Sequence, residues 1–178
     1  DTQVEIRDEN DNPLPIGEIG QICAKGPQIM KGYWNKKEES EKALKGGWMH
    51  TGDAGRMDEE GFVFIQDRIK DMIVSGGENI YSTEVEAALF AHPDVVDAAV
   101  IGVPDEKYGE VVKACIVKKE GSNVTEADLI SFCKDRIASY KKPQSVDFID
   151  EVPRNASGKV LKKVLREPYW KDQERQVS

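Results

Sequence analysis

The spacing of apolar side chains in this 178-residue chain changes once, at the polar stretch 67–80. Before this stretch, apolar and polar residues alternate with period two, as at Val4, Ile6 and residues 18–24. This alternation predicts half-buried strands. After it, strand-like runs alternate with segments of helical spacing, such as Leu129, Ile130, Cys133 and Ile137. The change predicts two folding units, joined at this stretch.

We predict a small, mostly β unit over residues 1–66, a hinge over 67–70 and an α+β unit over 71–178. The first unit should open with a β-hairpin whose long loop, residues 8–13, has a turn composition. A short helix over 37–44 should follow, ended by two glycines, and then two strands over 54–57 and 62–66.

In the second unit, residues 72–74 have the apolar content of a short buried strand. Thr83 and Glu86 have the spacing of a capping box at the start of a helix, and Thr125 should cap a second helix over 126–139. The remaining predicted elements are strands over 95–103, 110–118 and 146–149, a polar loop over 151–159 and a short helix over 160–166. The sheet should be small, with helices packed against it.

The formal net charge of −8 argues against broad binding to nucleic acid or to an anionic membrane. Any anionic ligand must then be held by a local group of cations. The apolar runs are too short to span a membrane, and no signal peptide is visible. Cys23, Cys115 and Cys133 lie far apart in apolar segments, so we interpret them as buried hydrophobic residues of a protein in a reducing compartment. The chain opens on Asp1 in strand-like alternation, which suggests a piece of a longer protein.

Three groups of polar residues could bind or react. A carboxylate at Asp53, on a predicted tight turn, could accept two hydrogen bonds from a vicinal diol, or could bond its own turn. Arg68 and Lys70 flank one residue, so in an extended segment both would point the same way and could hold phosphate or ribose oxygens. They could equally be two solvated cations at a linker. Ser75, Gly76 and Gly77 follow a predicted strand and would let a ligand approach the backbone closely.

Residues 153–159 superficially resemble a Walker loop, but Pro153 stands where that motif needs glycine and Val160 replaces its hydroxyl residue. We therefore reject a Walker site. A mobile loop that presents Lys159 beside Gly158 remains, and a lysine can place positive charge where negative charge builds in a transition state. The alternative is an ordinary exposed loop lysine. No metal cluster, Ser-His-Asp set or paired-carboxylate site is evident, and His50 and His92 read as a surface turn residue and a helix-end residue.

The motifs follow one another along the chain at residues 32–34, 47–53, 67–71, 75–80 with 84–86, 140–143 and 153–159. Taken together and in this order, they closely resemble the carboxy-terminal third of adenylate-forming enzymes, which include acyl-CoA synthetases, luciferases and peptide synthetase adenylation domains. The resemblance covers about residues 4–166, and the Val-Ser-Gly-Gly-Glu-Asn sequence is most similar to that of acyl- and aryl-CoA ligases, fatty-acid ligases included.

This resemblance implies a carboxylic acid, ATP, Mg²⁺ and CoA as the reactants and cofactors of an acid–thiol ligase. It implies that Lys159 is the catalytic cation, that Asp53 and Arg68 bind the nucleotide, and that Lys70 is the hinge residue. Ser75, Gly76 and Gly77 match the loop that lines the CoA tunnel. It also implies a protein lysine acetyltransferase as a partner at Lys159, and a cytoplasmic enzyme that could associate peripherally with membranes.

The family's phosphate loop, adenine motif and acyl pocket would lie before Asp1. We therefore expect that this piece alone does not adenylate, and that its partner is its own missing amino-terminal domain. Residues 1–66 should then expose apolar surface and could self-associate or be partly disordered. Two alternatives remain open: an adenylation domain that loads a carrier protein, and a binding or regulatory module that has lost the chemistry. Retention of Asp53, Arg68 and Lys159 argues against the second.

Overall fold

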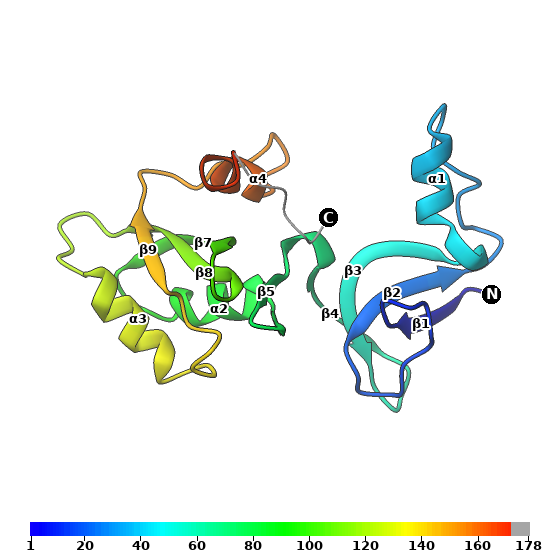
Figure 1. Ribbon diagram of the computed structural model, residues 1–178, viewed down its shortest axis with the longest axis horizontal. Helices are drawn as coiled ribbons and strands as arrows, with labels where there is room; N and C mark the ends of the chain where they lie inside the picture. Colours follow the sequence, from blue (N-terminus) through cyan, green and yellow to red (C-terminus); the bar gives the residue numbers. More distant parts are fainter. Residues whose placement is uncertain (172–178) are drawn as a thin grey trace. The chain divides into compact units, whose positions relative to one another are not determined.

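The computed structural model describes residues 1–171, and the chain divides into two compact units, residues 1–70 and the residues from 71 onward (Figure 1). The predicted second unit extends over residues 172–178, which lie outside the described residues. Both units combine sheets with short helices, which confirms the α+β prediction. Within the described residues, no helix has the length and apolar character needed to span a bilayer.

The first unit is built on a four-stranded antiparallel sheet with the strand order β1-β2-β3-β4. The strands are β1 (Gln3–Arg7), β2 (Gly20–Lys25), β3 (Met49–Met57) and β4 (Val63–Arg68), and α1 (Lys37–Ala43) precedes the short 3₁₀ turn η1 (Lys45–Gly47). The predicted hairpin and helix are therefore present. Its buried apolar residues include Ile6, Ile22, Cys23, Trp48 and Ala54.

Two boundaries in this unit differ from the prediction. β3 begins at Met49, so residues 51–53 lie within a strand and not on a free tight turn. β4 extends to Arg68, inside the segment predicted as the hinge, because Asp53 pairs with Arg68 and Ala54 with Asp67. Cross-strand pairing thus continues two residues further than the apolar pattern indicates.

The second unit contains a five-stranded sheet in which β6, β5, β8 and β7 are adjacent in that order and β9 pairs with β8. All pairs are antiparallel except β8–β9, which is parallel. The strands are β5 (Ile73–Ser75), β6 (Glu78–Ile80), β7 (Val95–Asp105), β8 (Gly109–Lys118) and β9 (Ser145–Phe148). The helical elements are η2 (Ile69–Asp71), which joins the units, and α2 (Ser82–Phe90), α3 (Glu126–Lys134), α4 (Lys162–Arg166) and η3 (Glu167–Tyr169).

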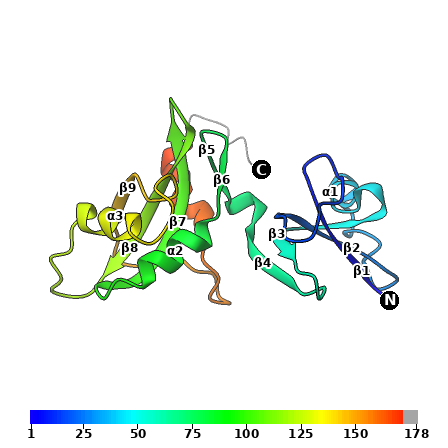
Figure 2. The ribbon, with the colours of Figure 1, turned by 90° about the horizontal axis from the view of Figure 1, so that it is seen from below.

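Apolar residues on both faces of this sheet are buried, which explains why β7 and β8 read as near-continuous hydrophobic runs. On one face α2 and α3 pack against the sheet, with Val85, Leu89 and Leu129 fully buried (Figure 2). On the other face Ile101 and Cys115 form a smaller cluster, against which Leu165 of α4 and Tyr169 of η3 pack. The predicted strands and helices are present, with shifted ends.

The two predicted helix caps have opposite outcomes. Thr125 accepts a hydrogen bond from the backbone N–H of Asp128, and the Asp128 carboxylate accepts one from the backbone N–H of Thr125, which confirms a cap at Thr125. The capping box at Thr83 is wrong, because α2 begins at Ser82 and the Glu86 carboxylate accepts from the backbone N–H of Val100 instead. A tertiary partner has replaced the local one.

The predicted second helix is also too long. α3 ends at Lys134, and after it the backbone N–H of Arg136 donates to the carbonyl of Cys133, three residues earlier, as in a tight turn. All three cysteines are buried and free, as expected, and burial raises the pKa of each thiol to about 11. Several large apolar side chains of the first unit are mostly exposed: Ile16, Trp34, Phe62 and Ile65.

Asp147 links β9 to β8 and η3, and it should make the second unit sensitive to acid. Burial alone would raise the pKa of Asp147. The Asp147 carboxylate accepts hydrogen bonds from Lys113, at 2.6 Å, and from Tyr169, and it is attracted by the positive charge of Lys113. Together these interactions outweigh burial and hold the pKa below its ordinary value. A carboxylate whose pKa is lowered by folding stabilises the folded state at pH values above its pKa in the unfolded chain, about 3.9. This stabilisation is lost as the pH falls through the pKa of the folded state.

We therefore expect Asp147→Asn to flatten the loss of stability below about pH 4. The contribution should be at most about 1 kcal/mol, because the carboxylate is 37% exposed and water screens the pair. Urea unfolding at pH 7 and below pH 4 measures it. A variant whose acid sensitivity equals that of the wild type would contradict this role.

Candidate active site

Asp53 and Arg68 face each other across β3 and β4. Their Cα atoms are register partners, and the Asp53 Oδ1 accepts a hydrogen bond from the Arg68 Nε at 3.3 Å. Both side chains are about one-third exposed, at 34% and 38%. The pair thus presents a carboxylate, which can accept from hydroxyls, beside a guanidinium, which can donate to phosphate or ribose oxygens.

Thr51 and Gly52 determine how Asp53 is presented. The Thr51 hydroxyl donates to the carbonyl of Ile22 at 2.8 Å and accepts from the backbone N–H of Asp53 at 3.1 Å. Gly52 has φ of +77°, a conformation that side chains with a Cβ rarely adopt. The turn-like signal of these residues therefore reflects a local distortion inside β3, at a position where the prediction had a free turn.

Lys70 follows Arg68 by two residues but does not share its strand. It lies in η2 (Ile69–Asp71) and is exposed, so the extended geometry that would align the two cations is not present. The next residue, Asp71, is tied to Arg166 at 2.7 Å, and both of these side chains are 13% exposed. The connection between β4 and β5 is short, and the second unit begins with this partly buried ion pair.

Ser75, Gly76 and Gly77 form the β5–β6 hairpin. Ser75 pairs with Glu78, and the two glycines between them have φ of +60° and +88°, the backbone of a tight turn with two left-handed residues. The backbone N–H of Gly76 donates to the carbonyl of Tyr108 at 2.9 Å, and a Cβ at Gly76 would lie 3.2 Å from the Tyr108 ring. The tip of this hairpin is exposed and carries no side chain.

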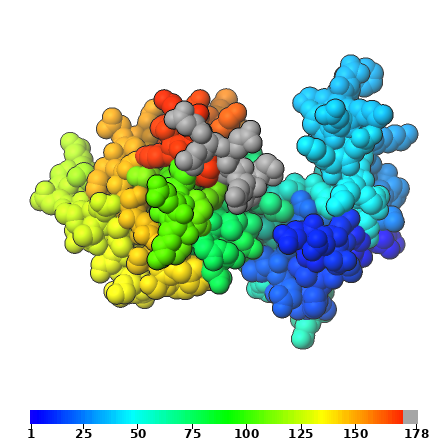
Figure 3. All heavy atoms as spheres, in the orientation of Figure 1, coloured from blue at the N-terminus to red at the C-terminus, as the bar shows by residue number. Residues whose placement is uncertain are grey.

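Lys159 lies on an exposed loop that is closed by a backbone bridge between Arg154 and Val160. Figure 3 shows the surrounding segment, coloured orange, at the surface of its unit. Within residues 1–171, the Lys159 ammonium group has no carboxylate within ion-pairing distance. The lysine is therefore accessible, and its charge is available to a ligand.

The loop over residues 154–160 is nonetheless well defined, because Asn155 forms hydrogen bonds with its backbone. The Asn155 side-chain carbonyl accepts from the backbone N–H of Ser157 at 3.1 Å and of Lys159 at 2.8 Å. The backbone N–H of Asn155 donates to the carbonyl of Lys159 at 2.9 Å, and Gly158 has φ of +81°. These bonds hold the backbone of Lys159, while the residue itself is exposed.

His50, predicted as a surface turn residue, is a partly buried residue of β3, and its side chain is 13% exposed. Its Nδ1 lies 2.7 Å from the Gln21 Oε1 and 3.5 Å from the Cys23 Sγ. Its Nε2 lies 3.5 Å from the Asp11 Oδ1. The prediction is wrong because Met49 and His50 extend β3 and pair with β2. His92 is at the end of α2, as predicted, where its Nδ1 accepts from the backbone N–H of Asp94 at 3.1 Å.

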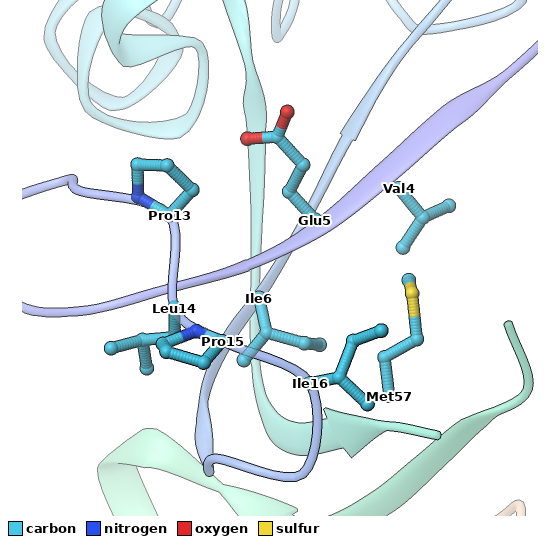
Figure 4. Close-up of a pocket in the computed structure, with 8 residues that line it drawn as sticks. All are labelled: Val4, Glu5, Ile6, Pro13, Leu14, Pro15, Ile16 and Met57. Atoms are coloured by element: carbon cyan, nitrogen blue, oxygen red, sulfur yellow. The ribbon is translucent and has the colours of Figure 1, made fainter. Parts of the chain in front are cut away.

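A small apolar cavity in the first unit does not suit a nucleotide. It measures about 100 Å³ and is lined by parts of β1, the loop after it and Met57 (Figure 4). Its one charged residue, Glu5, is bound to Arg7 at 2.7 Å. Ligand pockets are typically about 300–1,000 Å³. No three His, Cys, Asp or Glu side chains in residues 1–171 are grouped so that they could hold a metal ion.

Comparison with known proteins identifies the relatives of this chain. Residues 84–159 match the family described as the AMP-binding enzyme C-terminal domain. The chain is 44% identical over 97% of its length to the fatty acid–[acyl-carrier-protein] ligase ScoC of Streptomyces coeruleorubidus, and 45% identical over 93% to a long-chain-fatty-acid–CoA ligase of Escherichia coli. These matches cover 33% and 29% of the two relatives.

A solved structure agrees with this result. The crystal structure of ATP-bound MatB from Rhodopseudomonas palustris is 41% identical, with a TM-score of 0.88 over 94% of this chain and 34% of the MatB chain. The chain thus spans about a third of the length of the proteins it matches.

Proposed function

Because this chain belongs to the adenylate-forming enzymes through its AMP-binding C-terminal domain, we propose that it forms the carboxy-terminal part of an AMP-forming acyl-CoA ligase. The acid oxygen attacks the α-phosphate of ATP, which gives an acyl-adenylate and releases pyrophosphate. The CoA thiol then attacks the acyl carbonyl, the thioester forms, and AMP leaves. The proposed acid is a fatty or aromatic carboxylic acid.

Lys159 is the proposed catalytic residue, and its accessible ammonium group on a well-defined loop is the observation that carries the proposal. Adenylation brings a carboxylate anion up to a negatively charged phosphate. A cation placed between the two stabilises the charge that develops in the transition state. The lysine has a long stem and a compact charge, so it can reach this position from a surface loop.

The other proposed roles follow the geometry of each unit. Asp53 accepts hydrogen bonds from the ribose hydroxyls, and Arg68, bound to it at 3.3 Å, donates to a ribose or phosphate oxygen. Lys70, in the short η2 segment that separates β4 from β5, is the proposed hinge. At Ser75, Gly76 and Gly77, the bare hairpin tip leaves room for the narrow pantetheine arm of CoA.

Mg²⁺ would supply additional positive charge to the phosphates of ATP. The described residues of this chain offer no cluster of ligands for it, so we assign none of them to the metal. We place the protein in the cytoplasm as part of the same proposal. Acetylation of Lys159 by a protein acetyltransferase would remove the charge that adenylation needs. An unchanged rate of acid-dependent ATP–pyrophosphate exchange in the acetylated full-length enzyme would exclude this regulation.

A carrier protein in place of CoA is the second candidate. The observation that favours it is the 44% identity to a ligase named for an acyl carrier protein. The full-length protein should be assayed with fatty and aromatic acids, ATP and either CoA or a phosphopantetheinyl carrier protein. We expect acid-dependent pyrophosphate release and an acyl-CoA product. Acylation of the carrier alone would select the second candidate, and no acid-dependent pyrophosphate release would contradict both.

A further inference from the structure

The outer edge of β7 has no strand partner, because within the described residues β7 pairs with β8 alone. On alternate residues, side chains bind the backbone groups along this edge. Asp97 Oδ1 accepts from the N–H of Ala98 at 2.9 Å, and Glu86 Oε1 accepts from the N–H of Val100 at 2.8 Å. An unpaired strand edge needs such partners for its polar groups.

The same two carboxylates bind cations on either side of Lys159. Arg154, five residues before Lys159, donates to both oxygens of Asp97 at 3.0 and 2.9 Å. Lys162, three residues after it, lies 2.7 Å from the Glu86 Oε1. Each carboxylate therefore joins a backbone N–H of β7 to one end of the Lys159 loop.

The two attachments differ in exposure and in geometry. In the Arg154–Asp97 pair a single guanidinium nitrogen, Nη2, contacts both carboxylate oxygens, and the side chains are 42% and 24% exposed. The Lys162–Glu86 pair is more deeply buried, at 11% and 16%. Arg154 also donates to the carbonyl of Gly158 at 3.0 Å, directly beside Lys159. Movement of the Arg154 guanidinium would therefore displace the backbone next to the lysine.

We propose that Asp97 and Glu86 are positioning residues for adenylation: they mount the Lys159 loop on the edge of β7 and so determine where its ammonium group is delivered. Glu86 lies in the motif of residues 75–80 with 84–86 but has no proposed role of its own, and Asp97 lies outside the motifs. The inference rests on the proposed function of Lys159. It adds that a rigid attachment on both sides of the loop, at positions 154 and 162, is needed for that function.

The test uses Asp97→Asn in the full-length protein. Asparagine has a similar shape and can still accept from the N–H of Ala98, so this change removes mainly the charge that holds Arg154. We expect kcat of acid-dependent ATP–pyrophosphate exchange to fall by about 10- to 100-fold with little change in KM for ATP. Thioester formation from supplied acyl-adenylate should change by less than about twofold, because Lys159 is not used in that step.

Arg154→Gln should have the same effect: a lower rate of ATP–pyrophosphate exchange with little change in thioester formation. Neither Asp97→Asn nor Arg154→Gln should reduce exchange further in a Lys159→Ala background, because both act through that lysine. The control is Asp128→Asn, which removes the charge of the carboxylate that accepts from the backbone N–H of Thr125 at the start of α3, without touching the loop. Any effect of this control should be equal in the two half-reactions.

The outcomes separate the two proposals. If Lys159→Ala abolishes exchange while Asp97→Asn and Arg154→Gln leave it unchanged, or reduce both half-reactions equally, the positioning role is wrong and the proposed function stands. If Lys159→Ala itself leaves exchange unchanged, the proposed function is wrong, and the positioning role, which depends on it, is wrong as well.

Discussion

Lys159→Ala in the full-length protein is expected to lower the rate of acid-dependent ATP–pyrophosphate exchange by about 10²–10³-fold, the usual effect of removing one electrostatic stabiliser of a transition state. The rate of thioester formation from supplied acyl-adenylate should stay near that of the wild type. The reason is that Lys159 is proposed to act at the α-phosphate in the first step and to be withdrawn by rotation about the Lys70 hinge before the CoA thiol attacks. Radiolabelled pyrophosphate exchange measures the first effect, and acyl-CoA formation measures the second.

Lys163 provides the matched control. It is exposed and lies four residues after Lys159 in the same basic segment. Lys163→Ala removes the same charge from a helix and not from the loop, and exchange should remain close to wild type. Equal losses in the two variants would show that the general positive charge of the segment matters, and would contradict a specific role for Lys159.

Leu129→Ala is expected to have the largest effect on stability. Leu129 is fully buried between α3 and the sheet, in the main core of the second unit. Replacing such a leucine removes apolar burial and leaves a cavity, which costs about 2–5 kcal/mol. This is a large share of the roughly 5–15 kcal/mol that stabilises a typical domain.

Hydrogen exchange of the β8 amides under native conditions measures this change in the second unit directly. Ser131→Ala is the control, because Ser131 is exposed on the same helix. It should alter stability by less than about 0.5 kcal/mol. Wild-type protection of β8 in Leu129→Ala would mean that α3 does not stabilise the sheet as its packing indicates.

Most of the fold follows from local patterns in the sequence. The apolar runs of β7 and β8, the hairpin of β1 and β2, and the cap at Thr125 each depend on neighbouring residues, and each is present in the structure. The differences occur where a distant partner decides the outcome. Glu86 binds Val100 and Lys162 rather than its own helix start, and Arg68 continues β4 because Asp53 pairs with it.

The candidate site divides in the same way. Asp53, Arg68 and Lys159 stand out in the sequence as candidates with open alternatives, and the resemblance to adenylate-forming enzymes gives them their roles. The structure adds the 3.3 Å pair between the first two and the exposure of the third. Asp97 and Arg154 are 57 residues apart, and no periodicity could bring them together. His50 was missed because the turn composition around Gly52 conceals a strand.

Chemical restoration of the lysine tests the central claim most directly. Lys159→Cys in the full-length protein can be treated with 2-bromoethylamine, so that the thiolate displaces bromide and an ammonium group returns at nearly the original distance. Native Cys23, Cys115 and Cys133 are buried, with the pKa of each raised to about 11, and should react slowly. We predict that Lys159→Cys loses pyrophosphate exchange and that aminoethylation at this position, verified by mass spectrometry, restores it. Retained exchange in the unmodified cysteine variant, or no recovery after complete modification, would contradict the assignment of Lys159 as the cation that promotes adenylation.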